Sequence, residues 1–311
     1  MAMVAAKKND TLIDLLPVVC GRYQADANLS GRSWFRTGGT AEVLFEPKDP
    51  DDLQLFLAKR PAATAITVIG FGSNLLIRDG GVDGVVISLG SKFTEVAFDG
   101  LVVEAGAAAL DINVARSARE NGIAGLEFLS GIPGTIGGAV KMNAGAYGTD
   151  LSDVVIDVTV FDGEGGVHVL NACQLEFSYR RSAISEDWVI VSARLQGEEG
   201  DPDEISGRMA LIAAARSKSQ PRTRTGGSTF ANPPGHKAWE LIEKAGCRGL
   251  RRGGAAVSEQ HCNFLLNTGS ATSTDLELLG EEVRCRVLEK TGVHLEWEIK
   301  RIGNSPCRSI G

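Results

Sequence analysis

The stretch GIPGTIGGAVKMNAGAYG, residues 131–148, decides how the rest of this 311-residue chain is interpreted. It holds six glycines and one charged residue, Lys141. Ordering many glycines costs conformational entropy, so such a stretch needs a close approach of backbone to another backbone or to a ligand. Successive N–H groups in a glycine-rich turn can also converge on phosphate oxygens. Two interpretations stand at this point: tight turns in a sheet-rich domain, or a cradle for a ligand.

Two features favour the ligand. Asn143 and Tyr147 are polar groups inside an otherwise small and apolar run. A second glycine-rich turn, GFGSN at 70–74, lies upstream between two strand-like runs. This turn does not match the dinucleotide-binding fingerprint of Rossmann domains, because the third glycine is missing and no helix is predicted after it.

Composition limits the classes of protein and partner. The length is enough for two or three domains, and 43% apolar residues indicate a globular chain. A net charge of −7 without a strong basic cluster argues against nucleic acid or an anionic membrane as the main partner. Six scattered cysteines without a C-x-x-C pair indicate reduced thiols, and the scattered histidines predict no metal site. No secretory signal or membrane-length apolar run is present, so we expect a cytoplasmic protein.

Periodicity, caps and turn residues predict alternating helices and strands. The expected strands are 42–45, 65–69, 75–78, 84–89, 101–105, 154–161, 167–170, 175–180, 188–195, 261–267 and 293–300. The expected helices are 11–22, 51–59, one capped by Asp111 and ending before Gly122, one capped by Asp201 and ending before Pro221, 237–245, and one opened by a Thr274-x-x-Glu277 capping box and ended by Gly292.

Three polar residues stand out once these elements are drawn. Arg180 falls at the end of a strand on its polar face, and Glu298 on the polar face of the last strand. Ser228 lies between glycines and an Asn-Pro turn. Each also has an ordinary structural interpretation, as a strand-end charge, an edge-strand charge and a turn serine. Spacing alone cannot bring the three together.

Motifs along most of the chain carry a family resemblance. They are VIGFGSNLLI at 68–77, GIPGTIGGAVKMNAGAYG at 131–148, FSYRRS at 177–182, GGSTFANP at 226–233, AGCRGLRRGGAAVSEQHCNFLLN at 245–267 and EWEIKRIG at 296–303. In these, from about residue 35 to 303, the chain resembles the UDP-N-acetylenolpyruvoylglucosamine reductase (MurB) family. Its compact C-terminal third is similar to the shorter, type II form.

The resemblance implies an α+β fold. It implies a two-lobed FAD-binding domain of the vanillyl-alcohol-oxidase (PCMH) type and a smaller α+β substrate domain. The implied division is a helical lead-in at 1–30, the FAD-binding domain at 31–198 with lobes at about 31–92 and 93–198, the substrate domain at 199–303 and a tail at 304–311. A monomer is expected.

The resemblance also implies a reaction. The enolpyruvyl ether of UDP-N-acetylglucosamine enolpyruvate is reduced to UDP-N-acetylmuramate for peptidoglycan synthesis, with NADPH as hydride donor and non-covalently bound FAD. Hydride passes from flavin N5 to C3 of the substrate, and Ser228 gives the proton to C2. Arg180 and Glu298 stabilise the enolate-like intermediate, which fits the need for a cation where negative charge develops.

The resemblance assigns binding roles to further residues. The cofactor residues are Ile69, Gly70, Gly72, Ser73, Asn74, Leu75, Gly131, Ile132, Pro133, Gly134, Thr135, Gly137, Gly138, Asn143, Ala144 and Gly145. The substrate residues are Tyr147, Tyr179, Lys218 and Asn232. The family often has lysine after Phe230, where this chain has Ala231, so the basic residue that meets the diphosphate is one of Lys218, Arg222 and Arg224.

Two other functions compete with this one. A flavin oxidase of sugars or lactones on the same cofactor fold should lack the Ser228 and Glu298 motifs and should not need NADPH. A non-catalytic flavin- or nucleotide-binding protein is expected to have lost Arg180, Ser228 or Glu298, and all three are present.

Overall fold

The computed structural model describes residues 11–221 and 223–306. The strands are β1 Arg22–Asn28, β2 Thr40–Glu46, β3 Ile66–Ile69, β4 Leu75–Ile77, β5 Val82–Ser88, β6 Val96–Asp99, β7 Val102–Gly106, β8 Ile123–Ala124, β9 Gly145–Ala146, β10 Thr149–Asp150, β11 Val155–Phe161, β12 Val167–Asn171, β13 Val189–Gln196, β14 Glu198–Glu199, β15 Arg251–Arg252, β16 Ala255–Val257, β17 Leu265–Asn267 and β18 Lys300–Ile302. The helices are α1 Leu12–Leu15, α2 Pro50–Lys59, α3 Asp111–Glu120, α4 Ile136–Lys141, α5 Leu151–Val154, α6 Pro202–Ser219, α7 Ala238–Lys244 and α8 Ser273–Thr291, with short 3-10 turns η1 Ser30–Arg32, η2 Ser91–Phe93 and η3 Glu127–Gly131.

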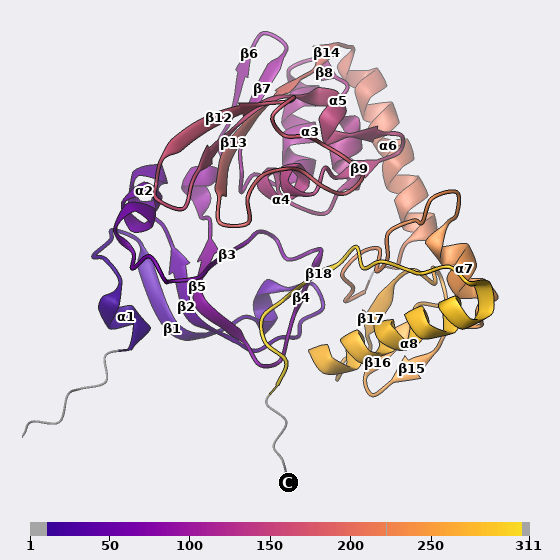
Figure 1. The fold of residues 1–311 in the computed structure, drawn as a ribbon. Helices are drawn as coiled ribbons and strands as arrows, with labels where there is room; N and C mark the ends of the chain where they lie inside the picture. The colour runs from indigo at the N-terminus through magenta and orange to yellow at the C-terminus, as the bar shows by residue number, and fades with distance from the viewer. Residues whose placement is uncertain (1–10, 222, 307–311) are drawn as a thin grey trace, which may run out of the picture.

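The first sheet lies at the lower left of Figure 1 and has the strand order β1–β2–β5–β3. β2 pairs antiparallel with β1, and β5 pairs parallel with both β2 and β3. Helix α2 packs on this sheet, with the ring centroid of Phe56 4.5 Å from that of Phe45. The helix begins at Pro50 because the Asp49 carboxylate accepts from the Asp52 N–H at 3.0 Å and proline fits the first helical position.

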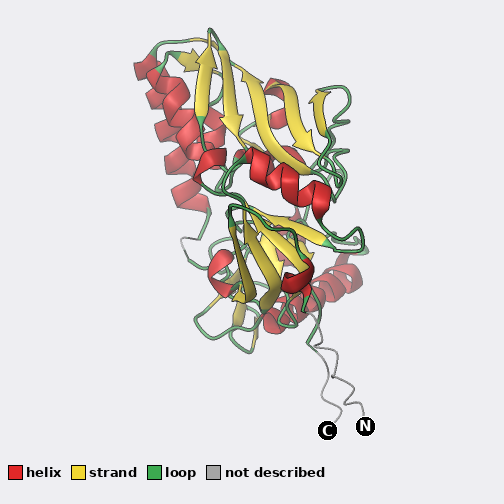
Figure 2. Cartoon of the chain, turned by 90° about the vertical axis from the view of Figure 1, so that its left-hand side faces the viewer, coloured by secondary structure: helices red, strands yellow, loops and turns green. Residues whose placement is uncertain are grey.

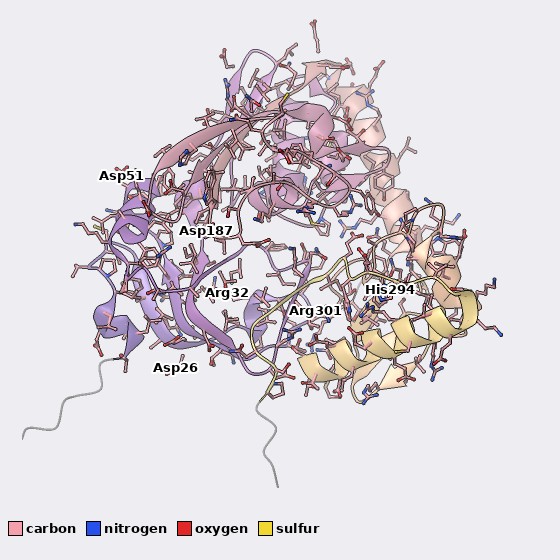
Figure 3. The ribbon with its side chains drawn as sticks, in the orientation of Figure 1. Asp26, Arg32, Asp51, Asp187, His294 and Arg301 are labelled. Carbon is pink, nitrogen blue, oxygen red and sulfur yellow. The ribbon has the colours of Figure 1, made fainter. Side chains whose placement is uncertain are left out.

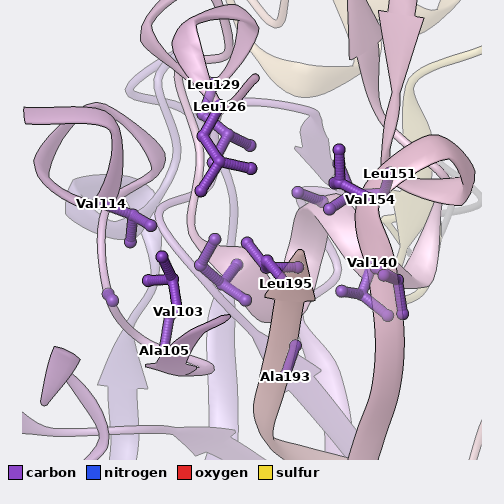
Figure 4. Packing of buried hydrophobic residues seen from close by; sticks show 14 of the residues in the cluster. Val103, Ala105, Val114, Leu126, Leu129, Val140, Leu151, Val154, Ala193 and Leu195 are labelled. Carbon is purple, nitrogen blue, oxygen red and sulfur yellow. The ribbon is translucent and has the colours of Figure 1, made fainter. Parts of the chain in front are cut away.

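The second sheet forms the upper part of Figure 1 and is wholly antiparallel, in the order β12–β11–β13–β7–β6. Figure 2 shows these strands with helices packed beside them. Its core joins small and branched side chains of β7 and β13 to those of α3, α4, α5 and η3, and Figure 4 shows how they interlock. Residues in this core are Val103, Val114, Leu129, Val140, Leu151 and Leu195.

The C-terminal unit follows α6, which runs from the second sheet towards α7 in Figure 1. It contains the sheet β15–β16–β17 with α7 and α8 against it. The last strand leaves this unit: β18 pairs parallel with β4, with Lys300 opposite Leu75 and Ile302 opposite Ile77. Phe35 and Leu76, from the first part of the chain, are buried in the same hydrophobic cluster as the C-terminal residues. Two residues of the first lobe therefore join the core of the C-terminal unit, while the sheet of the first lobe keeps hydrophobic clusters of its own.

Polar contacts reinforce this junction. Arg78 donates from Nη2 and Nε to both carboxylate oxygens of Glu277 in α8, at 2.8 and 3.0 Å. Arg301, labelled between β18 and α8 in Figure 3, donates to the same carboxylate at 3.0 Å. Asp79 accepts from the N–H groups of Ser273 and Thr274 at the first turn of α8, at 3.0 and 2.8 Å. A carboxylate at a helix N-terminus is favourable, so the first lobe fixes the orientation of α8.

Several elements differ from the sequence-based expectation. The helix expected at 11–22 is only α1, and residues 22–28 form β1 of the first sheet. The strand expected at 175–180 is absent, and the chain there makes a turn closed by a bridge between Ser178 and Arg181. Of the strand expected at 293–300, only residue 300 is in β18; the segment before it has no regular secondary structure and makes a single bridge, Phe230 to Trp297.

Two helix starts are also corrected. The cap of α8 is Thr272, which shares a capping box with Asp275, because Thr274 instead donates its hydroxyl to Asp79 at 2.6 Å. Leu110 holds the cap position of α3, and Asp111 is the first helical residue with a fully buried side chain. Among the described residues, no helix combines the length and apolar character that crossing a membrane requires.

Candidate active site

A cavity of about 770 Å³ lies between the two sheets and β18. Its walls include the turn between β3 and β4, the glycine-rich stretch through α4, and residues of β18. The lining contains all the predicted cofactor residues except Gly131, Pro133, Asn143 and Gly145. Segments far apart in sequence, at 66–75 and at 132–144, thus form one concave surface.

The hydroxyl of Thr135 lies between the two glycine-rich segments. A Cβ added at Gly70 would stand 2.8 Å from Thr135 Oγ1, and one added at Gly138 would stand 3.8 Å from the same atom. At Gly72 a positive φ of 70° and the nearby carbonyl of Arg32 both require glycine. Apart from the backbone of its own helix, no other atom lies within 4 Å of a Cβ placed on Gly138, and Gly138 lines the cavity, so a larger side chain there would extend into it.

Arg180 and Glu298 meet at the cavity wall. Arg180 Nε donates to Glu298 Oε1 at 3.2 Å, and its Nη2 donates to the carbonyl of Gly145 at 3.3 Å. The carbonyl of Glu298 accepts from Asn74 Nδ2 at 3.1 Å, which ties it to the first glycine-rich turn. Burial raises the pKa of Glu298 above its ordinary value, and the positive charge and hydrogen bond of Arg180 oppose this rise. Arg180 has φ of 58°, so a turn and not a strand end presents its guanidinium.

The backbone next to Ser228 is hydrogen-bonded to the segment that carries Glu298. The neighbouring Thr229 carbonyl accepts from the N–H of Glu298 at 2.9 Å, and Phe230 bridges to Trp297. Gly227 has φ of 79°, a conformation that favours glycine, and turns the chain towards the first glycine-rich turn. The side chain of Ser228 is half-buried and is not part of the cavity lining. The structure therefore brings the Ser228 segment to the edge of the cavity.

The predicted substrate residues lie outside the cavity lining. Asn232 Nδ2 is 3.5 Å from the Tyr179 hydroxyl, and the Arg180 guanidinium carbon lies 4.9 Å from the centre of the Tyr179 ring. Tyr147 is half-exposed, with its ring against the backbone of Gly131. Lys218 is exposed on α6.

Of the other two basic residues considered for the diphosphate, Arg224 is exposed and Arg222 lies outside the described residues.

Sequence reasoning missed several lining residues. Arg32, Trp34, Lys141, Trp188 and Lys300 line the cavity without belonging to the cofactor residues predicted from the two glycine-rich turns. Lys141 Nζ donates to the carbonyls of Ile184 and Ser185, and burial lowers its pKa. A charged residue within the glycine-rich stretch was the available signal for Lys141. No local sequence pattern predicts Lys300 as a lining residue, because it reaches the cavity only through the pairing of β18 with β4.

Comparisons with known proteins cover nearly the whole chain. Residues 220–302 match the family profile "UDP-N-acetylenolpyruvoylglucosamine reductase, C-terminal domain", and residues 41–171 match "FAD binding domain". The chain is 56% identical to the UDP-N-acetylenolpyruvoylglucosamine reductases of Paramagnetospirillum magneticum, over 96% of this chain and 98% of the relative, and of Parvibaculum lavamentivorans, over 97% of each.

A crystal structure of UDP-N-acetylenolpyruvylglucosamine reductase (MurB) from Thermus caldophilus superposes with a TM-score of 0.79 at 34% identity, covering 92% of this chain and all of that one. These matches confirm the expected α+β fold with an FAD-binding domain and a C-terminal domain, and they confirm FAD as the cofactor. The fold, the cofactor-binding domain and the sequence relatives all indicate the same family. The chain therefore belongs to the UDP-N-acetylenolpyruvoylglucosamine reductase family.

Proposed function

We propose that the protein is a UDP-N-acetylmuramate dehydrogenase that uses NADPH and FAD to reduce UDP-N-acetylglucosamine enolpyruvate in the cytoplasm, as a monomer. The single observation that carries the proposal is the Arg180–Glu298 pair at the cavity wall, 3.2 Å between Nε and Oε1, with the Ser228 segment hydrogen-bonded beside it. A cation and a buried carboxyl group at the wall of a flavin-sized cavity, with a serine-bearing segment at its edge, suit reduction followed by protonation.

The residues of the cavity fit FAD. The two glycine-rich turns leave backbone and the Thr135 hydroxyl at the surface, and a Cβ at Gly70 or Gly138 would enter the space between them. Apolar residues such as Ile69, Ile132 and Trp188 also line the cavity, which suits a flat aromatic ring. The chemistry that bound FAD supplies is hydride transfer, from NADPH to the flavin and from the flavin to C3 of the enolpyruvyl group.

Side chains of the protein stabilise the negative charge that develops on the substrate and donate the proton. Hydride addition at C3 leaves negative charge at C2 and on the substrate carboxylate, and the Arg180 guanidinium at the cavity wall is placed to stabilise it. Gly145 and Glu298 hold that guanidinium from two sides. Ser228 Oγ delivers the proton to C2. The two residues before it must be glycine, because a Cβ on Gly226 would clash with the Phe35 ring and Gly227 has a φ of 79°.

In this proposal the substrate is bound by Tyr147, Tyr179, Asn232 and Lys218. Tyr179 and Asn232 approach each other across the boundary between the second lobe and the C-terminal unit. A ligand held by both would sit next to Arg180, whose guanidinium lies over the Tyr179 ring. The division into an FAD-binding domain at 31–198 and a substrate domain at 199–303 belongs to the same proposal.

Spectroscopy of the purified protein tests the function. The protein should be yellow, and anaerobic NADPH should bleach its flavin absorbance without any substrate. The enolpyruvyl UDP-sugar should then restore the colour. Reduction by a free sugar or lactone, with oxygen as the acceptor and no response to NADPH, would support the oxidase alternative. A flavin that neither NADPH nor sugar reduces would support a binding protein.

A further inference from the structure

Asp111 carries a buried carboxyl group that the proposed reaction does not use. The residue is 0% exposed, and neither carboxylate oxygen makes a hydrogen bond of normal geometry; only the nearby Gly134 backbone favours its charged form. Within residues 11–221 and 223–306, no other acidic side chain is both buried and without a partner for its two oxygens. Burying a polar group without compensation costs free energy, so the position requires a physical reason.

The backbone around Asp111 is tied to the second glycine-rich turn. Its N–H donates to the carbonyl of Gly134 at 3.1 Å, and Leu110 forms a bridge with Thr135. The N–H groups of Ile136 and Gly137 donate to carbonyls just before α3, at 3.0 and 2.9 Å. Asp111 therefore cannot move without moving the wall of the cavity.

The carboxyl group lies where the two glycine-rich turns meet. A Cβ built on Gly134 would stand 3.0 Å from Asp111 Oδ2 and 3.7 Å from Ser73 Oγ, so both oxygens border the same small space. Gly134 and Ser73 line the cavity. The hydroxyl of Ser73 also has no hydrogen-bond partner among the described residues.

Asp111 serves neither as a helix cap nor as an ion-pair partner. Leu110 occupies the cap position of α3 and makes no side-chain cap hydrogen bond. In the part of the chain that the structure describes, the Asp111 carboxylate contacts no basic side chain. Burial holds the pKa of Asp111 well above its ordinary value, and the Gly134 backbone only partly opposes this rise. A protonated carboxyl group can donate a hydrogen bond as well as accept one.

We propose that Asp111 is a positioning residue for the cofactor: when FAD fills the cavity, its carboxyl group and the Ser73 hydroxyl form a hydrogen bond that locks the 70–74 turn against the 131–135 turn. The inference rests on FAD binding in this cavity. Asp111 Oδ2 and Ser73 Oγ border the same point, at 3.0 and 3.7 Å from a Cβ placed on Gly134, and rotation of the Ser73 side chain is the movement that would join them. The lock would hold together two cradle segments that are far apart in sequence.

Flavin affinity, measured as the FAD dissociation constant by flavin fluorescence, tests the lock. Asp111→Leu keeps a similar volume but cannot hydrogen-bond, and it should weaken FAD binding roughly fivefold, the effect of losing one hydrogen bond. Asp111→Asn keeps a neutral hydrogen-bonding group and should bind FAD nearly as the unmodified protein does. Ser73→Ala should weaken binding as much as Asp111→Leu, and the double variant should be no weaker than either single one.

Thr225→Val is the matched control. Thr225 also has a buried hydroxyl without a partner, but it lies in the C-terminal unit, bridged to Leu266, so FAD affinity should not change. Unchanged affinity in folded Asp111→Leu, or additive losses in the double variant, would overturn the lock. Loss in Asp111→Asn equal to that in Asp111→Leu would do the same.

The Ser73 variant keeps the test decisive if Asp111→Leu does not fold, as thermal unfolding of the flavin-free protein would reveal. Ser73 is only half-buried, so Ser73→Ala should fold, and unchanged FAD affinity in it would overturn the lock by itself. Failure of the proposed function is distinguishable, because in that case the unmodified protein would hold FAD but NADPH would not reduce it.

Discussion

Arg180 Nε donates a hydrogen bond to Glu298 Oε1 over 3.2 Å, although 118 positions separate the two residues. Arg180 comes from a turn of the second lobe and Glu298 from the segment that runs into β18. The pair therefore forms only when the last residues of the chain return to the first lobe. This relationship makes both the chemistry and the pH dependence of the site testable.

Glu298→Gln should slow reoxidation of the flavin by substrate about a hundredfold, since the swap keeps shape and removes the charge beside Arg180. Steady-state kcat and kcat/KM should fall together, as they do when an interaction made only in the transition state is lost. Glu296→Gln is the control, because Glu296 is exposed and should behave like the unmodified enzyme. The reverse result, with Glu296→Gln crippled, would refute the assignment.

Ser228→Ala should separate the half-reactions. NADPH should reduce the flavin at a near-normal rate, because no substrate proton moves in that step. Reoxidation by substrate should slow roughly a hundred- to ten-thousand-fold, as expected for loss of a general acid. Stopped-flow absorbance of the flavin reports both steps, and equal slowing of both would mean that Ser228 shapes the site without donating the proton.

Arg180→Met should make stability fall more steeply as pH rises. Burial raises the folded-state pKa of Glu298 above its ordinary value of 4.5, and Arg180 opposes this. A raised pKa means that the contribution of this group to stability is present below pH 4.5 and is lost as pH rises through the folded pKa. Without Arg180 the pKa rises further, so the loss is larger.

Thermal unfolding midpoints from about pH 4.5 to 8 measure this slope, which follows from the linkage between protonation and folding. In the double variant Arg180→Met/Glu298→Gln, the unfolding midpoint should no longer fall more steeply with pH than it does in the unmodified protein. A slope in Arg180→Met equal to that of the unmodified protein would show that the ion pair does not control the protonation of Glu298.

Gly138→Val should give a folded but colourless protein. Outside the backbone of α4, the nearest atom to the new Cβ is Thr135 Oγ1, and Gly138 lines the cavity where the flavin is expected, so the added methyl groups should occupy that space. Gly207→Val is the control: Gly207 is exposed on α6 with nothing within 4 Å of an added Cβ, so flavin content should be kept. Full flavin occupancy in Gly138→Val, read from the absorbance spectrum, would contradict the assignment of this cavity to FAD.

Asp79→Ala should destabilise the protein by about 0.5–2 kcal/mol, the usual effect of losing a carboxylate at a helix N-terminus. Asp79 accepts from two N–H groups of α8, so its removal also loosens the C-terminal unit on the first lobe. Glu289→Ala, at an exposed position of the same helix, should have little effect. Urea unfolding followed by circular dichroism compares the two, and equal stabilities would show that this contact contributes nothing.

Much of the fold could be predicted because its signals are local. β11 and β12 follow from a β-branched run and a glycine turn, and α6 from Asp201 and Pro202 at its start. The glycine-rich turns were also visible, since a positive φ or a close backbone contact, as at Gly72, leaves only glycine possible.

The remaining features depend on tertiary contacts. Period-two alternation before Arg180 suggested a strand, but no neighbouring strand in the described chain pairs with that segment, and it folds as a turn. Burial alternates from 293 to 296, but the alternation stops at Trp297 and Glu298, which are both half-buried, and the segment has little pairing. Asp111 looked like an ordinary helix cap, because sequence spacing does not reveal that packing would bury its carboxyl group completely.

Burial of two first-lobe side chains in the core of the C-terminal unit limits how this chain can be divided into separately folding pieces. Phe35 and Leu76, both 1% exposed, rest on residues that come more than a hundred positions later, and β18 covers one edge of β4. A shortened chain that stops at residue 198 would carry two bare apolar side chains and an open strand edge, which favours self-association. The two halves are therefore poor candidates for exchange as interchangeable modules, but good candidates for reassembly. Co-expressed as separate pieces, each would supply the surface on which the other completes its fold.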